Sequence, residues 1–444
     1  MSFSVLARHS RLAAVFFWVT LSRPCLLGAQ DPSSAAVASK VMYYDVAELL
    51  ETAEAGRPFP LSLDDSSCWV TVQRNYIRSD RYRARATDRN GRRAFLPPMA
   101  KIFKGKIAGE PDSTVRLSFG RRGLSGFVKR GDQTTYIEPL EDDSNDGHAK
   151  TQTAIPHRAI SDLGLEIVFD GTCGTDAPAR SNVQPTSPEP SSKALSAEGS
   201  FIEMEIAVEA DYEFFQIHGA NSAAKIEEFL NVVDGIFESQ LELTLAITSV
   251  EIFEADVDPY TTNDALGLLE QFRAHWNSQK GSVPRDVAHL FTGRELENNT
   301  VGIAYVEQVC KLGAAYGISQ SLTSETMMPL LVSHELGHNL GAFHDARNSR
   351  LKFVMNPVLH SSTLDEFSDQ SKSEIATYVN GMICLDIVLP EDSSDPGDVP
   401  PNGGTSPPTG GGAPAADGGG PVDPIVLLVG LWAVFHGLQR RLVR

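Results

Sequence analysis

The stretch "LVSHELGHNLGAFHDA", residues 331–346, places three histidines and one glutamate within eleven residues. The whole chain has only 11 histidines in 444 residues, so this concentration needs a chemical reason. An α-helix advances 3.6 residues per turn, so His334 and His338 project from one face, one turn apart. Two imidazole nitrogens at that spacing can share one Zn²⁺, each at about 2.0–2.1 Å.

The residues around this pair extend the zinc site. Glu335 adjoins His334 and leans toward the metal without binding it, so it is placed to take a proton from the attacking water. Gly341 can adopt the left-handed conformation that ends a helix, after which the chain turns and His344 returns as the third ligand. Three protein ligands leave one position open, which marks a catalytic rather than a structural zinc site.

A chance match is the alternative to a zinc site. HExxH alone occurs by accident in about one chain in fifty to a hundred of this size. The fixed places of Gly341, His344 and Asp345 reduce the chance of the full pattern to about one in a million. The sequence therefore predicts one zinc ion in this part of the chain.

The motif "HELGHNLGAFHD" resembles the extended motif of the metzincin metalloproteases. Asp345 after the third histidine is similar to the adamalysin (reprolysin, M12B) branch. "FVMNPVL" resembles the Met-turn and implies that Met355 is an apolar floor beneath the zinc; a core methionine is the alternative. "EFSDQSKSEIATYV" is similar to the closing segment of the family. The resemblance covers residues 201–387 and implies a zinc metalloendopeptidase with Glu335 as general base.

The resemblance also implies how a substrate is held. "VGIAYVEQVC", residues 301–310, resembles the edge strand beside the cleft, to which an extended peptide adds by main-chain hydrogen bonds. The segment 357–364 would wall the pocket for the side chain after the cleaved bond. A disulfide between Cys310 and Cys384 is implied, with two free buried thiols as the alternative.

A calcium site is a further implication of the resemblance. Glu205 and Asp286 match the positions of a glutamate on the first strand and an aspartate near "DVAHL" in some relatives. The asparagine expected after the last cysteine is replaced by Ile387. Ordinary surface carboxylates are therefore the alternative to Ca²⁺ ligands.

Strand-like and helix-like patterns alternate around the motif, which favours an α/β layer with a mostly parallel sheet. We expect strands at 201–211, 243–253 and 286–293 and helices at 222–241 and 264–276. The resemblance makes this a metzincin catalytic domain with a five-stranded sheet and an active-site helix carrying HExxH.

The chain begins with a pattern typical of export. Two arginines precede the apolar run "LAAVFFWVTL", and small residues follow, which predicts a signal peptide over residues 1–29. About ten apolar residues are too few to span a bilayer. Four cysteines remain after its removal, and in an exported protein an even number suggests disulfides, with three possible pairings.

Residues 30–174 read as a β-rich domain, because apolar and polar residues alternate between Gly or Asp turns. This text resembles the reprolysin propeptide. Cys173, which precedes Gly174, would then be a cysteine switch that fills the open zinc position, since a thiolate is a strong zinc ligand. A disulfide between Cys173 and Cys68 is the rival interpretation. Residues 175–200, rich in Pro, Ser and Ala, predict a linker that an activating protease cleaves.

Two segments follow the catalytic domain. Residues 388–424 have the composition of a disordered linker. Residues 425–444 hold an apolar core that as a helix would reach about 21 Å, short of the roughly 30 Å hydrocarbon core. This end, with its three arginines, resembles bacterial C-terminal sorting signals and implies a sorting protease. A permanent thin membrane anchor and a helix that packs on the protein are the alternatives.

Charge and composition limit the remaining choices. The formal net charge is −19 and no basic stripe is present, so nucleic acid is not an expected partner. The sequence predicts an exported zinc metalloendopeptidase made as a zymogen, secreted or held at the cell envelope, that acts on proteins or peptides. A catalytically silent zinc-fold adhesion or binding protein is one alternative, although the intact Glu335 argues against it. A zinc hydrolase acting on another substrate is a second.

Overall fold

The computed structural model describes residues 41–63, 66–97, 100–140, 154–161, 170–175, 199–347, 353–360 and 363–389. The expected signal peptide, most of the linker before residue 199, and the C-terminal linker and end from residue 390 onward lie outside these residues. Among the helices described, none is both long and apolar enough to cross a membrane.

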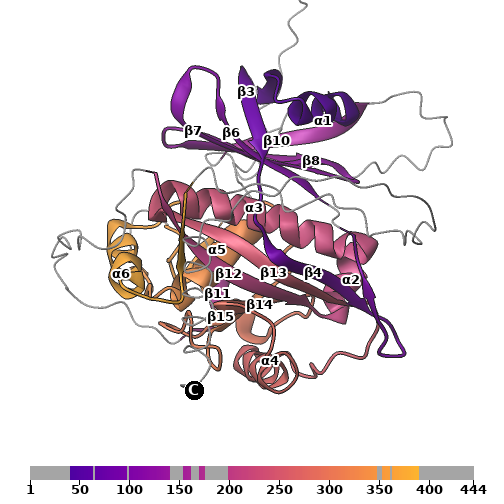
Figure 1. Ribbon diagram of the computed structural model, residues 1–444, viewed down its shortest axis with the longest axis vertical. Coiled ribbons are helices and arrows are strands. Elements are labelled where there is room, and N and C mark those ends of the chain that lie inside the picture. The colour runs from indigo at the N-terminus through magenta and orange to yellow at the C-terminus, as the bar shows by residue number, and fades with distance from the viewer. Residues whose placement is uncertain are drawn as a thin grey trace, which may run out of the picture. The chain divides into compact units, whose positions relative to one another are not determined.

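The β-rich first part of the chain forms an antiparallel sheet of eight strands, which we call the N-terminal sheet (Figure 1). Helix α1 (Val46–Glu54) packs on it and begins at Asp45, whose side chain accepts a hydrogen bond from the N–H of Glu48. In spatial order the strands are β1 (Val41–Asp45), β10 (Ala154–Ser161), β9 (Gln133–Pro139), β8 (Gly123–Arg130), β7 (Glu110–Gly120), β6 (Lys101–Ile107), β3 (Ser66–Arg74) and β2 (Phe59–Leu63).

Both faces of the N-terminal sheet are apolar. Successive side chains of a strand point to opposite faces, so neighbouring residues belong to different cores. On β6 and β8, Phe103 and Val128 pack in a core with α1, whereas Ile102 and Phe127 pack with the second layer of the molecule. This sheet is therefore sandwiched rather than half exposed.

The second sheet has ten strands and is mixed, and we call it the mixed sheet. Its central strands run parallel, as expected for an alternation of strands and helices. In spatial order it contains β17 (Val358–His360), β11 (Asp170–Cys173), β15 (Thr300–Ala304), β16 (Tyr316–Gln320), β14 (Val287–Thr292), β12 (Phe201–Ala210), β13 (Leu243–Phe253), β4 (Arg78–Thr87) and β5 (Arg93–Phe95), with β18 (Asp386–Val388) pairing with β12 outside this path.

The helices of this layer are α2 (Tyr212–His218), α3 (Ser222–Leu241), α4 (Ala265–Gln279), α5 (Met328–Asn339) and α6 (Asp369–Val379), with short 3₁₀ turns η2 (Gly219–Asn221) and η3 (Glu297–Asn299). Helix α3 and strand β13 have the bounds predicted from the sequence, and α4 ends three residues later than predicted. Apolar spacing and turn residues are local signals, which is why these elements could be read from the chain.

The mixed sheet differs from the five strands that we expected. Strands β15, β16, β14, β12 and β13 are adjacent, but β15 runs antiparallel to β16. Three strands from before residue 200 extend the sheet on both sides, because β4 and β5 add beyond β13 and β11 adds beyond β15. Such pairing depends on which edges meet in space, so no local pattern reports it.

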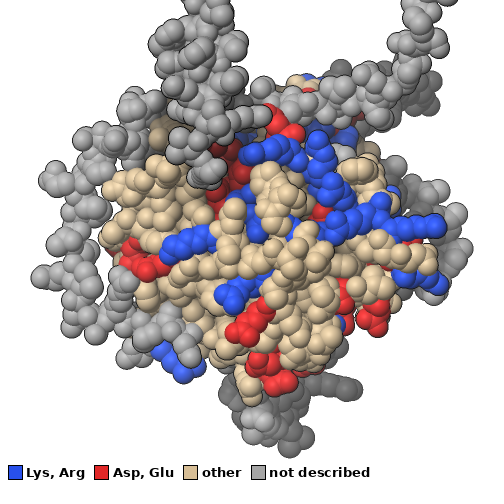
Figure 2. Space-filling view, turned by 60° about the horizontal axis from the view of Figure 1, so that its bottom comes forward, with Lys and Arg blue, Asp and Glu red and all other residues tan. Residues whose placement is uncertain are grey.

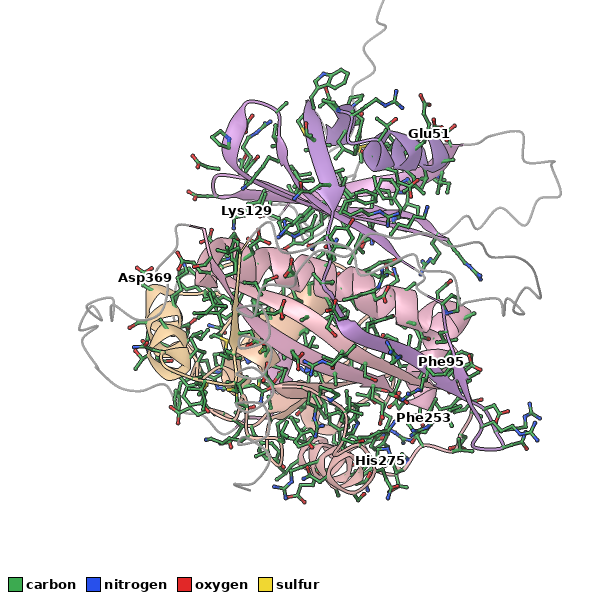
Figure 3. The ribbon with its side chains drawn as sticks, viewed as in Figure 1. Glu51, Phe95, Lys129, Phe253, His275 and Asp369 are labelled. Atoms are coloured by element: carbon green, nitrogen blue, oxygen red, sulfur yellow. A yellow bond between two sulfur atoms is a disulfide. The ribbon has the colours of Figure 1, made fainter. Side chains whose placement is uncertain are left out.

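Helix α3 lies between the two sheets (Figure 1). Every residue from Ser222 to Phe237 is buried, including several charged ones. A helix that is buried all round must be covered by two layers. Several acids of α3 are met by cations from earlier in the chain, since Arg78 of β4 pairs with Glu227 and Arg116 of β7 with Asp234. Lys129 of β8, labelled in Figure 3, likewise reaches Asp365 and Glu366.

Surface charge is unevenly distributed. Although the formal net charge is −19, Figure 2 shows lysine and arginine side chains gathered across one face of the molecule. Acidic side chains lie among and beside these cations on the same face.

Helix α4 offers a test of the local signals. Asp264 caps its first turn, because the carboxylate Oδ2 accepts a hydrogen bond from the N–H of Gly267 at 2.7 Å. We expect Asp264→Ala to lower the free energy of unfolding by about 1 kcal/mol and Asp264→Ser to retain most of it. Urea denaturation measures this change. Glu270→Ala, on the exposed side of the same helix, is the control and should change stability by less than about 0.5 kcal/mol.

Candidate metal centre and cleft

Helix α5 carries His334, Glu335 and His338 of the histidine motif, and it is buried. All of its residues from Met328 to Asn339 are buried. The helix ends at a glycine turn, where Gly341 has φ of +99° and its N–H donates to the carbonyl of His338 at 2.9 Å. This is the left-handed turn expected from the sequence, and it brings the chain back toward the helix face.

The three histidines of the motif converge. The Nε2 atoms of His338 and His344 lie 3.1 Å apart. The ring nitrogens of all three histidines and the sulfur of Cys173 lie within 4.8 Å of one another. The N–H at Nδ1 of His334 donates to the carbonyl of Val354 at 2.6 Å, and that of His338 to Ala342 at 2.8 Å. These bonds leave each Nε2 lone pair facing the common point.

This donor set fits a zinc ion. The Nε2 atom of His334 is buried and has no hydrogen-bond partner, although buried polar atoms are normally paired. Burial, followed by the neighbouring His344, lowers the pKa of His334 to about 3, so the ring is neutral as a ligand must be. Three imidazoles and one sulfur are donors that Zn²⁺ accepts in tetrahedral sites.

Glu335 is buried beside the cluster. Burial raises the pKa of its carboxyl well above the usual range. Strand β15 passes directly over it at Gly302, where an added Cβ would lie 2.4 Å from Oε1 of Glu335. A side chain at that position would displace the carboxylate, so the close approach of β15 to Glu335 requires glycine.

Met355 and Asp345 are buried near α5 and close to each other. Met355 is fully buried, and its sulfur would lie 2.6 Å from a Cβ placed at Gly337 of α5. The N–H of Asp345 donates to the carbonyl of Met355 at 2.8 Å, and its Oδ1 accepts from Ser368 Oγ at 2.6 Å. Asp345 therefore ties the methionine turn to the start of α6.

The cleft beside the cluster is filled by the chain itself. Strand β11 lies between β15, to which it is parallel, and β17, to which it is antiparallel. The N–H of Cys173 donates to the carbonyl of Pro357 at 3.1 Å, and the N–H of Gly174 to that of Gly302 at 2.9 Å. These are the two walls between which the sequence predicted a peptide substrate.

The edge strand is shorter than the predicted stretch 301–310. Strand β15 ends at Ala304, and the chain then turns. The N–H groups of Glu307 and Val309 donate to the carbonyls of His338 and Asn339 at 2.9 and 3.0 Å. The last carbonyls of a helix have no partner within it, so this turn satisfies the end of α5 instead of continuing the strand.

The cysteines separate into two roles. The sulfur of Cys173 lies 3.6 Å from Nε2 of His338 and 3.7 Å from Oε2 of Glu335. Cys68 is buried in the core of the N-terminal sheet, and neither of these two cysteines forms a disulfide. Cys310 and Cys384 are joined by a disulfide.

The expected calcium residues lie close together but already have partners. Oδ2 of Asp286 accepts a hydrogen bond from the N–H of Glu205 at 2.8 Å. The carboxylate of Glu205 is paired with Arg81 of β4. Burial raises the pKa of Asp286 to about 6. Calcium binding at this pair stays a prediction.

Sequence reasoning missed three contacts of the cleft. Gly302 admits Glu335, Thr175 Oγ1 donates to the carbonyl of Ala304 at 3.1 Å, and Asn339 Nδ2 donates to the carbonyl of Tyr305 at 2.8 Å. A glycine inside an apolar strand was the one available signal, since it often marks a close approach. The other two contacts join segments far apart in the sequence.

The α/β layer carries a buried cluster of three histidines and one cysteine that could hold a metal ion. Residues 200–385 match the model of the "Reprolysin (M12B) family zinc metalloprotease", so this part of the chain resembles the members of that family. A curated relative, "Zinc metalloproteinase-disintegrin-like atrase-A" from Naja atra, is 26% identical over 286 residues, which are 62% of this chain and 46% of the relative. The chain thus spans about half the length of that relative.

The turn at Gly341 can be tested through stability. A Cβ there would meet the Tyr378 side chain at 2.7 Å and would sit on a backbone with positive φ. We expect Gly341→Ala to cost about 1–3 kcal/mol of unfolding free energy, from strain and overpacking. Gly313→Ala is the matched control, because a Cβ at Gly313 meets nothing within 4 Å. Equal losses in chemical denaturation would show that this turn is not the constraint that we infer.

Proposed function

We propose that the chain is a zinc metalloendopeptidase, made as an exported zymogen, in which His334, His338 and His344 hold the metal and Glu335 is the general base. The observation that carries this proposal is the buried, unpartnered Nε2 of His334, directed at the same point as two further imidazoles beside a buried carboxyl. A buried lone pair without a donor is explained when a cation is its partner.

Each residue of the cleft has a role in this reaction. A bound Zn²⁺ supplies Lewis-acid polarisation of the scissile carbonyl and of the attacking water. Glu335 takes the proton of that water and later gives a proton to the leaving amine. Burial of Glu335 excludes bulk water from this transfer. Main-chain groups of β15, from Gly302 to Ala304, align the peptide by strand addition, and the segment 357–364 forms the opposite wall.

Latency would come from the chain before residue 175. Strand β11 lies between the two walls of the cleft, and the Cys173 sulfur is near enough to the histidines to be the fourth ligand. While sulfur holds that position, no water can be activated there. Cleavage within the linker 175–200 by an activating protease would allow β11 to leave, so Cys173 would act as a switch.

The proposed function implies a division of the chain into six segments. We propose a signal peptide over 1–29, a propeptide over 30–174, the linker 175–200, the catalytic domain over 201–387, a linker over 388–424, and a terminal segment over 425–444. The last segment would hold the protein at the envelope until a sorting protease acts, or would leave it secreted. Substrates would be proteins or peptides.

The proposal is tested on residues 199–389 produced without the N-terminal part, with Glu335→Gln as the partner variant. We expect both proteins to hold about one zinc by mass spectrometry, because Glu335 is not a ligand. Only the unchanged protein should cleave casein or a broad peptide library, since the variant cannot accept a proton. His344→Ala should lose the zinc, whereas His218→Ala, outside the cluster, should keep it.

The outcomes separate the alternatives. Zinc binding without cleavage of any peptide would favour a binding protein that kept the fold. Absence of zinc from the folded, unchanged protein would contradict the metal site itself.

Latency has its own test in the uncut chain. We expect Cys173→Ala in the full chain to raise peptidase activity by about tenfold or more over the unchanged, uncut chain, because the fourth ligand is lost while β11 can still detach transiently. Cys68→Ala, on the other free cysteine, is the control and should leave the uncut chain silent. Activation by both substitutions alike would point to a general loosening of the fold and against a switch.

A further inference from the structure

Ion pairs join the N-terminal part of the chain to the reprolysin domain, and the cations all lie on the N-terminal side. Nine ion pairs join described residues on the two sides, and in each one the cation comes from before residue 175 and the acid from after residue 199. The pairs are Arg78–Glu227, Arg81–Glu205, Arg85–Glu251, Lys104–Glu238, Arg116–Asp234, Arg116–Glu238, Arg122–Glu325, Lys129–Asp365 and Lys129–Glu366. None of these pairs involves Cys173 or the cleft.

Three of these cations stand on one strand that extends the sheet of the enzyme. Strand β4, "RSDRYRARAT", pairs in parallel with β13. The N–H of Ile247 donates to the carbonyl of Ile77 at 2.6 Å, and that of Glu254 to Thr87 at 2.9 Å. This is strand addition to a sheet edge, in which main-chain bonds hold the strand and side chains select it.

The selecting side chains are arginines that reach acids of three different elements. Arg78 binds Glu227 of α3 through two nitrogens, at 3.0 and 2.6 Å. Arg85 lies 3.3 Å from Glu251 of β13. Paired donors of this kind match the planar guanidinium better than a lysine, so the surface favours an arginine-rich strand.

Buried polar contacts on α3 add to this second attachment. Asn75 Nδ2 donates to Asn231 Oδ1 at 2.9 Å and to Asp234 Oδ2 at 3.0 Å, and all three residues are buried. At Gly235 the helix comes so close to the N-terminal sheet that a Cβ would lie 3.0 Å from Phe127. Apolar packing and charge therefore act over the same face.

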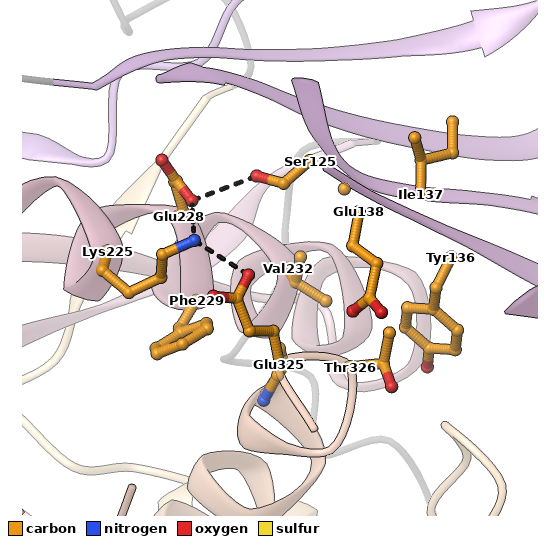
Figure 4. A pocket seen from close by; sticks show the side chains of 12 residues that line it. Ser125, Tyr136, Ile137, Glu138, Lys225, Glu228, Phe229, Val232, Glu325 and Thr326 are labelled. Atoms are coloured by element: carbon orange, nitrogen blue, oxygen red, sulfur yellow. Dashed lines mark hydrogen bonds and ion pairs between the residues drawn. The ribbon is translucent and has the colours of Figure 1, made fainter. Parts of the chain in front are cut away.

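A cluster at the N-terminal end of α3 shows how two acids, Glu228 and Glu325, depend on contacts with the N-terminal sheet (Figure 4). Lys225 Nζ binds Glu228 at 2.7 Å and Glu325 at 3.0 Å, so one cation serves two carboxylates. Ser125 Oγ donates to Glu228 at 3.1 Å, as Figure 4 shows. Arg122, outside that view, binds Glu325 at 3.0 Å. Without Arg122, the single charge of Lys225 would face the carboxylates of both Glu228 and Glu325.

We propose that the β13 edge and the acidic face of α3 form a docking surface for an arginine-rich strand, which β4 occupies, and that this surface holds the N-terminal part on the enzyme after the linker is cut. The inference rests on the proposed zymogen but does not use its cysteine switch. β4 and β11 belong to one polypeptide, so each attachment raises the effective concentration of the other. An uncovered β13 would also be a long exposed edge.

The experiment uses the full chain with a specific protease site introduced within residues 181–190. In the Cys173→Ala background the chain is cut and passed over a size-exclusion column at low ionic strength. We expect the two pieces to elute together. Arg81→Glu with Arg85→Glu, whose side chains are partly exposed, should weaken association on the order of a hundredfold and separate the pieces. Arg130→Glu is the control, because Arg130 pairs with Glu110 inside the N-terminal part.

Two results would overturn the inference. One is separation of the two pieces when Cys173→Ala is the only substitution. This result would mean that the Cys173 contact in the cleft is the only attachment between them. The other is equal weakening by Arg130→Glu, which would mean a general effect of charge. Circular dichroism of the separated N-terminal piece checks its folding, and Glu205→Arg should restore association lost to Arg81→Glu by about tenfold. Association is read without activity, so a failed peptidase assay leaves this test intact.

Discussion

The site depends on two hydrogen bonds that do not touch a substrate. The Nδ1 groups of His334 and His338 donate to main-chain carbonyls of Val354 and Ala342, and these bonds orient both rings. Each carbonyl lies in a turn that has its own support. Ala342 follows the glycine turn at Gly341, and the N–H of Val354 donates to Glu366 at 2.8 Å. Ring orientation, the methionine turn and α6 thus form one connected arrangement.

A second constraint governs the middle of the molecule. Helix α3 is buried on all sides yet carries acids, and a buried acid is costly unless a cation meets it. Its own lysine, Lys225, is shared by two carboxylates. Other acids of α3 are met by cations of the chain before residue 175, from β4 of the mixed sheet and from β6 and β7 of the N-terminal sheet. The first part of the chain therefore complements the charges of the part after residue 199, and it also occupies the cleft beside the histidines.

These two contacts of the N-terminal part differ in kind. Strand β11 fills the cleft by main-chain pairing near Gly302, which any extended peptide can imitate. Strand β4 joins the far edge through arginines matched to fixed acids, which an ordinary substrate cannot imitate. In our proposals the first contact governs activity and the second governs retention.

The sequence alone determined what depends on spacing along one element. The four-residue interval of His334 and His338 and the glycine at 341 predicted a metal-binding helix and its turn, and apolar periodicity located α3 and β13, because helix and strand periods are local properties. Tertiary structure alone decided the rest. Gly302 lies against Glu335, β15 ends at Ala304, and β4 and β11 extend the mixed sheet on both sides. Each of these features depends on segments that are distant in the sequence. The pairing of sheet edges depends on which surfaces meet in the folded protein, so the sequence of one strand does not identify the strand that it pairs with.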